Sequence, residues 1–388
     1  MELNWTPFDS EPGRKVAALK ALFKQGLRKQ LDPDYLCALA VDIGRCAPLG
    51  SDDLVVLTHE LIGCGDPTVS VWSVHAQALR LAGSIDAAID AAKQGLELAP
   101  ACGELLLLMG KLYSEKHQAG DAEELFRQAF QINPKGSVIA LCENLISQGK
   151  LDEASRLHKS AISQFGHTTA SRAMSCVISR LQKDWDQLDY WQNRGAIIQC
   201  SPEEHFGATR ITELNQEISQ CLLSHPSLVF EPQSTATSRG RQGFIGDLLP
   251  ATLSDSVIKL IQMQVAQSID KFPDHMIEGF QAKQASITCW AVILDKGGFQ
   301  HPHIHPAGLL SGVYYVDIPK PKADSSGGGS IVFGKPPCTL VKDGSDAFAI
   351  IQPSSGVMVL FPSYIYHSTI PHSSEEPRIC LSFDVCLS

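Results

Sequence analysis

Residues in the first half of the chain recur at a spacing of 34, and this period restricts the fold more than any other feature of the sequence. The recurring pairs are Ala76 and Gly110, Ala88 and Ala122, Leu98 and Ile132, and Pro100 and Pro134. A third copy has a loop two residues shorter, so that Ala154, Leu157 and Ala161 match Ala122, Leu125 and Ala129. A period of this length indicates stacked helical units, because one such unit cannot bury its apolar face alone.

Each period contains two amphipathic segments. Apolar residues at three- and four-residue intervals predict helices over 71–83 and 86–98. Small residues at the crossing let two helices approach closely, and a proline after the second helix ends it. The pattern resembles the tetratricopeptide repeat, with residues 15–65 as a degenerate earlier pair, and an irregular helical bundle is the alternative. Such solenoids commonly offer a concave surface to a peptide or protein, although some serve only as a scaffold.

The second half of the chain follows a different pattern. Helical periodicity continues to about residue 225, so we assign 1–228 to a tetratricopeptide-like helical repeat domain. Residues 229–242 are rich in small and polar side chains and predict a linker. A further amphipathic helix, opened by a Ser/Asp cap, is predicted over 254–270. Within 243–388, short β-branched and aromatic runs predict the strands of a barrel or sandwich. The runs are 287–294, 312–316, 330–333, 347–352, 356–361 and 378–385.

Composition excludes several classes of protein. A net charge of −10 argues against binding nucleic acid, because phosphate recognition needs a basic surface. The sequence contains neither a polybasic run nor an apolar stretch long enough for a spanning helix. Its 12 cysteines lie mostly inside apolar runs and lack metal or disulfide spacing, which favours a reducing compartment. The first residues lack the pattern of a secretion signal, so we expect a cytoplasmic protein without membrane or nucleic-acid partners.

Three histidines alternate in the sequence GGFQHPHIHPAG, at positions 301, 303 and 305, and His367 and Arg378 follow downstream. Alternate residues of an extended strand share a face, so His303 and His305 can reach one metal ion together. Non-haem iron oxygenases bind iron through two histidines and one carboxylate, which leaves positions open for 2-oxoglutarate and dioxygen. An arginine can hold the distal carboxylate of 2-oxoglutarate with its bidentate fork.

Over residues 284–386 the sequence resembles a family of 2-oxoglutarate/Fe(II)-dependent oxygenases. The ordered motifs are HIHPAGLLSGVYYVDIP, GGSIVF and GVMVLFPSYIYHSTIPHSSEEPRICLSFDV, preceded by Trp290 and a turn at Gly297–Gly298. The resemblance implies a C-terminal double-stranded β-helix (jelly-roll) domain, and hence an α+β multidomain chain. It also implies Fe(II) and 2-oxoglutarate as cofactors, with dioxygen as a further substrate.

The resemblance also assigns roles to individual residues. The implied metal ligands are His303, His305 and His367, and the implied cosubstrate ligands are Arg378, Tyr315 and Ser382. Alternation along the strand means that only one of Tyr314 and Tyr315 points inward. His305 departs from the wider superfamily, which has Asp at this place in a His-x-Asp motif. The ligand set of this chain therefore carries one negative charge fewer.

Other interpretations of these residues remain open from sequence alone. His301 fits a surface or pocket-rim position, His305 fits a turn cap beside Pro306, and His372 fits a solvated loop. His303 and His367 are also compatible with core histidines without a metal. Arg378 has Glu375 and Glu376 as alternative partners, although an arginine within an apolar strand normally needs a buried anion.

Three functions are compatible with the sequence. The first is a dioxygenase that hydroxylates a substrate, for which the repeats favour a peptide or protein, and converts 2-oxoglutarate to succinate and CO2. The second is a non-catalytic, repeat-based interaction protein with a degenerate metal- or metabolite-binding β domain. The third is a cupin-like metalloenzyme that does not use 2-oxoglutarate and does not need Arg378. The Gly-rich segment 317–330 is either a mobile lid or a plain connection.

Overall fold

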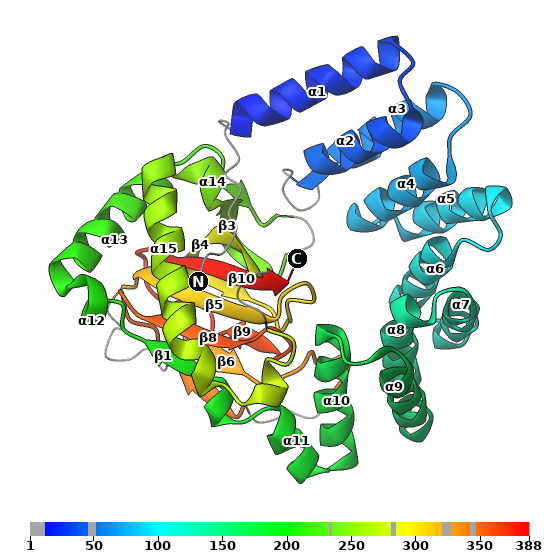
Figure 1. Cartoon of the computed structure of the whole chain (residues 1–388). Coiled ribbons are helices and arrows are strands. Elements are labelled where there is room, and N and C mark those ends of the chain that lie inside the picture. Colours follow the sequence, from blue (N-terminus) through cyan, green and yellow to red (C-terminus); the bar gives the residue numbers. More distant parts are fainter. Residues whose placement is uncertain are drawn as a thin grey trace. The chain divides into compact units, whose positions relative to one another are not determined.

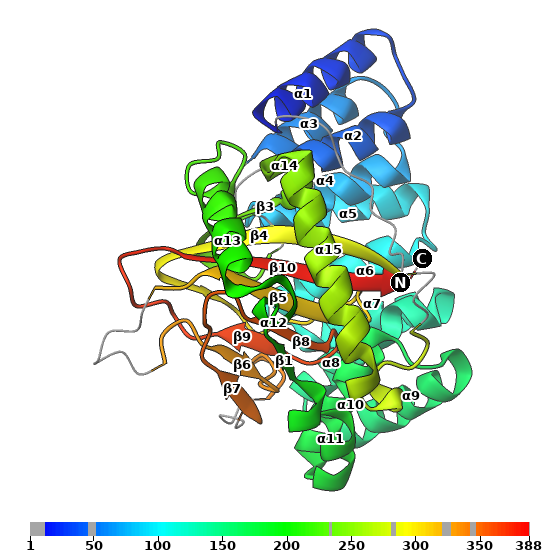
Figure 2. The same cartoon turned by 60° about the vertical axis from the view of Figure 1, so that its left-hand side comes forward.

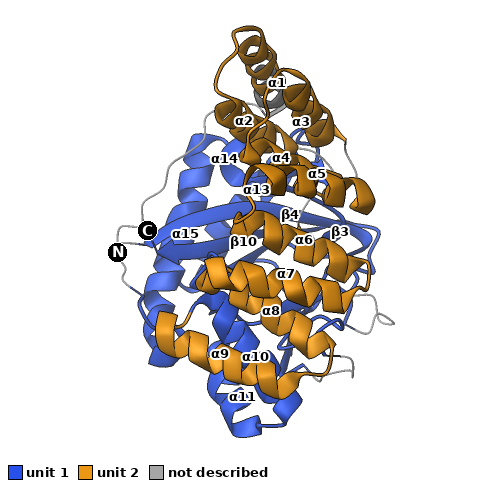
Figure 3. Ribbon diagram, turned by 90° about the vertical axis from the view of Figure 1, so that its right-hand side faces the viewer, with its two compact units in different colours: residues 1–12, 168–231, 236–388 blue, residues 13–167, 232–235 orange. Residues whose placement is uncertain are grey.

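The computed structural model describes residues 12–45, 52–232, 235–280, 285–319, 327–341 and 347–387. The chain divides into two compact units (Figure 3). The helical unit comprises residues 13–167 and 232–235, and the β unit comprises 168–231 and 236–388 together with the start of the chain. Most of the first residues, considered above for a secretion signal, and residues 320–326 of the expected lid lie outside the described residues. No described helix combines the length and apolar character needed to cross a bilayer.

The helical unit contains the expected repeats. Its helices are α1 (Pro12–Arg28), α2 (Pro33–Arg45), α3 (Asp53–Gly63), α4 (Val69–Leu81), α5 (Ile85–Leu98), α6 (Gly103–Glu115), α7 (Ala119–Ile132), α8 (Pro134–Ser147) and α9 (Leu151–Phe165). The starts of α4 and α6, and of α5 and α7, are each 34 residues apart, which confirms the tetratricopeptide-like period. Where we expected a degenerate pair over 15–65, the structure has the three helices α1 to α3.

Small side chains lie at the helix crossings, as the repeat pattern predicts. The equivalent residues Ala88, Ala122 and Ala154 are each 0% exposed. A Cβ atom added to Gly110 on α6 would lie 2.5 Å from the ring of Phe126 on α7. Only a residue without a side chain therefore allows these two helices their observed approach.

A substitution at Gly110 tests this crossing. We expect Gly110→Ala to lower the free energy of unfolding by about 1–3 kcal/mol, because the added methyl group overpacks the crossing. Gly120→Ala on α7 is the matched control, since nothing lies within 4 Å of its added Cβ atom. The control is expected to be neutral or slightly stabilising. Urea denaturation followed by circular dichroism measures both variants. Equal midpoints for the two variants would contradict the tight crossing.

The β unit contains two antiparallel sheets (Figure 1). The larger sheet has the order β1-β8-β5-β10-β4-β3-β2, and the smaller has the order β7-β6-β9. The strands are β1 (Ile198–Cys200), β2 (Val229–Phe230), β3 (Thr237–Phe244), β4 (Ala285–Gln300), β5 (Leu310–Asp317), β6 (Ile331–Phe333), β7 (Ala349–Ile351), β8 (Met358–Pro362), β9 (His367–Thr369) and β10 (Arg378–Leu387). Helical repeats followed by antiparallel sheets confirm the expected α+β multidomain class.

Helices cover one face of the larger sheet. The helices of the β unit are α10 (Thr169–Gln182), α11 (Trp185–Trp191), α12 (Glu203–Phe206), α13 (Ala208–Leu222), α14 (Ile245–Leu248) and α15 (Ala251–Ser268). Figure 2 shows α13 and α15 running across the strands. Apolar residues of both helices share one core with the odd-numbered residues of β10 from 379 to 385. Because side chains alternate along a strand, the even-numbered residues from 378 to 384 lie on the opposite face.

The boundary between the units differs from the one we expected. Helices α10 to α13 belong to the β unit rather than to the repeats. The Thr169 hydroxyl donates to the Gly308 carbonyl at 2.8 Å, and the Arg180 guanidinium donates to the Gly334 carbonyl at 3.0 Å. Helical periodicity indicates that a segment is helical but not which core it packs against, so the sequence could not place this boundary.

Residues 229–242, expected to be a linker, contain β2 and most of β3. Both strands lie at one edge of the larger sheet, where β3 pairs with β4. A strand near a sheet edge tolerates Ser, Thr, Gly and Arg side chains, and this composition is the reason that the sequence predicted a linker here. Residues 233 and 234 of this segment lie outside the described part of the chain.

Two local expectations are also wrong. Helix α15 begins at Ala251 with Pro250 as its N-cap, so Ser254 lies within the helix and does not cap it. Gly297 and Gly298 form no turn but an irregularity within β4, where the pairing with β3 shifts register. Gly297 has φ +79°, and a Cβ atom added to Gly298 would lie 2.4 Å from the Arg239 carbonyl oxygen. The bulge therefore needs glycine, and β4 continues through it to Gln300.

Candidate metal and cosubstrate site

Backbone pairing brings the histidines of two distant segments together. His303 and His367 form an antiparallel bridge, with both N–H···O distances at 3.0 Å. The backbone N–H of His305 donates to the Ser363 carbonyl at 3.1 Å. The segment 301–305 therefore runs extended beside the segment leading into β9, and His303 and His305 point to the same side.

Each of the three imidazoles uses its Nδ1 atom to contact a hydrogen-bond acceptor. Nδ1 of His303 lies 2.7 Å from the His301 carbonyl, and Nδ1 of His367 lies 3.0 Å from the Ile365 carbonyl. Nδ1 of His305 lies 2.5 Å from Oδ1 of Asp384. Because carbonyls and carboxylates only accept, each Nδ1 carries its proton, and Nε2 is the atom of each ring that can offer a lone pair to a metal ion.

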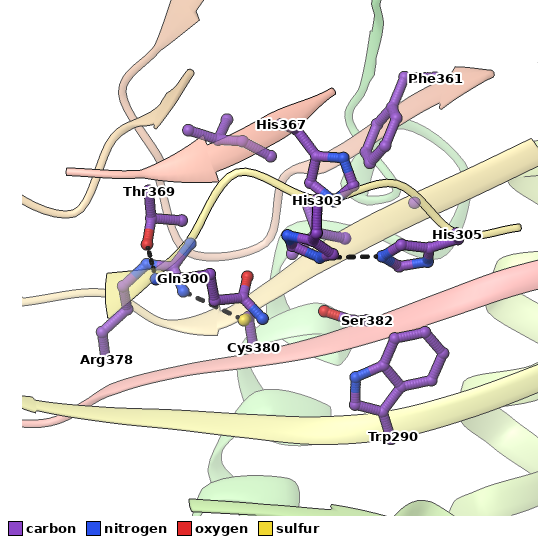
Figure 4. A pocket seen from close by; sticks show the side chains of 13 residues that line it. Trp290, Gln300, His303, His305, Phe361, His367, Thr369, Arg378, Cys380 and Ser382 are labelled. Carbon is purple, nitrogen blue, oxygen red and sulfur yellow. Dashed lines mark hydrogen bonds between the residues drawn. The ribbon is translucent and has the colours of Figure 1, made fainter. Parts of the chain in front are cut away.

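The three free lone pairs converge. One ring nitrogen from each of His303, His305 and His367 lies within 4.8 Å of the others, and Nε2 of His303 is 3.2 Å from Nε2 of His305. Figure 4 shows the three rings grouped close together in the pocket. Burial and then the neighbouring His305 lower the pKa of His303 to about 4, and burial lowers the pKa of His367 well below its ordinary value. Converging neutral imidazoles are the donor set that iron, zinc and similar ions prefer.

Arg378, the first residue of β10, is a buried cation. Its side chain is 1% exposed, its Nη1 lies 3.2 Å from the Cys380 sulfur, and its Nε has no hydrogen-bond partner in the described part of the chain. Its guanidinium carbon lies 5.1 Å from the centre of the Tyr315 ring. Among the described residues, no acidic group lies within ion-pair distance of it. An uncompensated buried charge costs several kcal/mol, so the environment of Arg378 fits an anion from outside the chain.

The remaining walls of the pocket come from both sheets (Figure 4). Cys380 and Ser382 follow Arg378 along one face of β10. Tyr315 lies on the same side of the sheet as Arg378, with its buried hydroxyl lacking a partner among the described residues, whereas the Tyr314 hydroxyl donates to Asn215 on α13. Of the two tyrosines, Tyr315 therefore faces Arg378. The other lining residues are Trp290, Gln300, Gly312, Val313, Ile331, Phe361 and Thr369.

Three alternatives left open by the sequence can be compared with the structure. His301 is exposed, contacts the Ser238 hydroxyl at 3.0 Å and lies outside the histidine cluster. His372, expected to be solvated, is buried, and its Nε2 lies 2.7 Å from the Glu376 carbonyl. Its backbone also pairs with both glycines of the β4 bulge, which explains the burial. Glu375 pairs with Lys296 at 2.5 Å, away from Arg378.

Sequence reasoning missed Asp384, Cys380 and Thr369. Strand alternation offered a signal for all of them, because Cys380 and Asp384 share a face with Arg378 and Ser382, and Thr369 is two residues after His367. Thr369 accepts a hydrogen bond from the Gln300 backbone at 2.7 Å. The pairing of Asp384 with His305 gave no signal, since the two residues are 79 positions apart in the sequence.

Residues 288–384 match the model of a protein family described as "Putative 2OG-Fe(II) oxygenase". This segment contains the three histidines of the cluster, Arg378 and Asp384. The match confirms the resemblance inferred from the motifs. A search of curated proteins found no match.

Several solved structures are similar to parts of this chain. A prolyl-4-hydroxylase from Pseudomonas putida is 15% identical, with a TM-score of 0.35 over 50% of this chain and 93% of that chain. An oxidoreductase of the 2OG-Fe(II) oxygenase family from Burkholderia pseudomallei is 13% identical, with a TM-score of 0.34 over 57% and 91%. A thermophilic TPR protein from Thermus thermophilus is 22% identical, with a TM-score of 0.32 over 46% and 89%. Similarity at this level does not bear on substrates or partners.

The lowered pKa values predict how the metal-free protein responds to acid. Because His303 has a pKa of about 4 when folded, it stays neutral at pH 5, where a histidine in an unfolded chain is largely protonated. The unfolded chain therefore binds more protons between about pH 6.5 and pH 4, and the folded state loses stability as the pH falls through this range. Nitrogen NMR of the histidine rings, assigned with His303→Gln, measures the pKa directly. Titration of His303 near pH 6.5 would contradict the desolvation of this ring.

Proposed function

We propose that this chain is a 2-oxoglutarate- and Fe(II)-dependent dioxygenase, which hydroxylates a peptide or protein while 2-oxoglutarate is converted to succinate and CO2. One observation carries the proposal. A single pocket joins three converging imidazoles to a buried guanidinium for which the described residues provide no counter-ion. The three imidazoles fit a metal ion, and the guanidinium fits the distal carboxylate of a dicarboxylic acid.

The donor set of the cluster fits Fe(II). Three neutral imidazoles are chemically sound ligands for this ion, and hydrogen bonds at every Nδ1 fix the ring orientations in advance. His303, His305 and His367 would hold the metal and leave its other positions open. When bound, iron would activate dioxygen as the oxidant for both 2-oxoglutarate and a C–H bond of the substrate, and the protein would supply orientation and a dry pocket.

Arg378 provides the reason to propose 2-oxoglutarate rather than a metal alone. Its planar fork suits bidentate binding of a carboxylate, and burial strengthens that interaction by excluding water. The hydroxyls of Ser382 and Thr369 line the same pocket as Arg378, and the Tyr315 ring lies beside the guanidinium, so these three hydroxyls are candidate further donors to the carboxylate. A cupin-like enzyme without 2-oxoglutarate would have no use for this buried charge.

Apolar side chains form much of the rest of the pocket wall. Trp290, Phe361, Ile331 and Val313 line the pocket beside the histidines. Such a lining restricts water near the metal and strengthens electrostatic interactions inside the pocket. The Trp290 ring centre lies 5.5 Å from that of His305, which places this large apolar surface next to a proposed ligand.

The helical unit supports a peptide or protein as the substrate or recruiting partner. Tetratricopeptide-like solenoids expose a long concave surface suited to extended chains. The fusion of such a unit to a pocket of this kind favours a macromolecular substrate over a free metabolite.

Single substitutions of the histidines test the metal site. Changing a residue that only hydrogen-bonds to a metal ligand typically weakens metal binding roughly 10- to 100-fold. We expect a larger loss of Fe(II) affinity for each of His303→Gln, His305→Gln and His367→Gln, because each removes a ligand itself. Anaerobic titration against a competing chelator measures the affinity. His301→Gln is the matched control, because His301 belongs to the same segment but lies outside the cluster, and it should bind Fe(II) like the wild type. Equal losses in all four variants would count against the assignment.

A substitution of Arg378 tests the cosubstrate site separately. Anaerobic Fe(II) with 2-oxoglutarate should give the weak visible charge-transfer band of a chelated complex. We expect Arg378→Gln to raise the 2-oxoglutarate concentration needed for half of this band on the order of 100-fold, through loss of a charge-assisted bidentate pair. Fe(II) affinity without 2-oxoglutarate should change little. A wild-type protein that binds Fe(II) but never gives the band would favour the cupin-like alternative.

A further inference from the structure

The wider superfamily has a carboxylate as a direct metal ligand. This chain also has a carboxylate near the site, but it contacts the His305 ring on the side that points away from the metal site. His305 stands where Asp is usual, and its Nδ1 lies 2.5 Å from Oδ1 of Asp384. The side chains of His305 and Asp384 are 12% and 14% exposed, so little water screens the contact. A hydrogen bond from an imidazole N–H to a carboxylate is charge-assisted and is stronger than one to a neutral carbonyl.

Asp384 is itself held in place by a short chain of buried hydroxyls. The Ser311 hydroxyl donates to Oδ1 of Asp384 at 2.6 Å, and it lies 2.7 Å from the Ser363 hydroxyl. Ser311 and Ser363 are both 0% exposed. Because the Ser311 proton goes to Asp384, Ser363 donates to Ser311. Oδ1 of Asp384 thus accepts from both Ser311 and His305, as an ionised carboxylate does.

The other two imidazoles lack an equivalent partner in the described part of the chain. Nδ1 of His303 and Nδ1 of His367 each contact a neutral backbone carbonyl. A carboxylate on Nδ1 orients the ring and increases the electron density available at Nε2 more than a carbonyl does. Among the described members of the cluster, only His305 therefore has an anion behind it.

We infer that Asp384 is a positioning residue, which supplies through His305 the negative charge that the His-x-His ligand set lacks. The inference rests on the proposed function in one respect, that the cluster binds a metal ion. Asp384 does not touch the metal in this arrangement, because its oxygen contacts the nitrogen that points away from the cluster. It fixes the direction of the His305 lone pair and makes His305 a stronger donor.

Zn(II) affinity of the full chain provides the test, since Zn(II) accepts the same imidazole donors and needs neither dioxygen nor turnover. We expect Asp384→Asn to weaken Zn(II) binding about 10- to 100-fold, because the amide can still accept a hydrogen bond but carries no charge. Asp317→Asn is the control: Asp317 is an exposed residue on the neighbouring strand β5, and its loss removes one charge without touching a histidine. It should leave the affinity unchanged.

A double-mutant cycle shows whether Asp384 acts through His305. In a His305→Gln background, the further change Asp384→Asn should weaken Zn(II) binding by no more than about threefold, because the ring that links the two is gone. Equal losses in both backgrounds would mean that Asp384 acts only as a distant charge, which overturns the inference. Proton NMR of the Zn(II)-loaded wild type should also show a strongly downfield Nδ1–H resonance of His305 that moves upfield in Asp384→Asn.

The outcomes separate this inference from the proposed function. If the wild type binds neither Zn(II) nor Fe(II), the metal site itself is wrong. If the wild type binds Zn(II) and Asp384→Asn binds it equally well, the metal site stands and the role of Asp384 is wrong. Thermal unfolding of the metal-free Asp384→Asn protein identifies a folding defect. In that case Ser311→Ala, which keeps the carboxylate but removes its buried donor, should show a smaller loss of Zn(II) affinity in the same direction.

Discussion

The hydrogen bonds at the three Nδ1 atoms are the interactions on which the site depends. A neutral imidazole has one donor nitrogen and one acceptor nitrogen, so fixing the donor also fixes the direction of the lone pair. Two backbone carbonyls and one carboxylate do this for His303, His367 and His305. The resulting cluster places lone pairs within 4.8 Å of one another, an arrangement that repels unless a cation lies between them.

Strand β10 organises both halves of the pocket. One face of this strand packs on α13 and α15, and the opposite face carries Arg378, Cys380, Ser382 and Asp384. At one end of that face lies the buried guanidinium, and near the other lies the carboxylate behind His305. Both residues lie on one face of the same strand. The regular geometry of β10 therefore fixes the distance between Arg378, the proposed cosubstrate anchor, and Asp384, which contacts the proposed ligand His305.

Much of this arrangement could be predicted from sequence, because it depends on local periodicity. The 34-residue period predicted the helical repeats, and the alternation of His303 and His305 placed both on one side of the chain. The pairing of Asp384 with His305 depends on tertiary contact between segments 79 residues apart, which periodicity does not report. Packing also decided the position of α10 to α13, the pairing of β3 and the burial of His372. In each case the local sequence fits more than one environment.

Succinate production tests the central claim most directly. Purified wild-type protein is incubated with Fe(II), 2-oxoglutarate and dioxygen, and succinate is measured against a sample without dioxygen and against His367→Gln. Because the pocket joins the metal site to the cosubstrate site, we predict slow, dioxygen-dependent succinate formation that His367→Gln abolishes. Tight binding of Fe(II) and 2-oxoglutarate without succinate, even with candidate peptides added, would contradict the account and indicate a repeat protein with a non-catalytic metal and metabolite site.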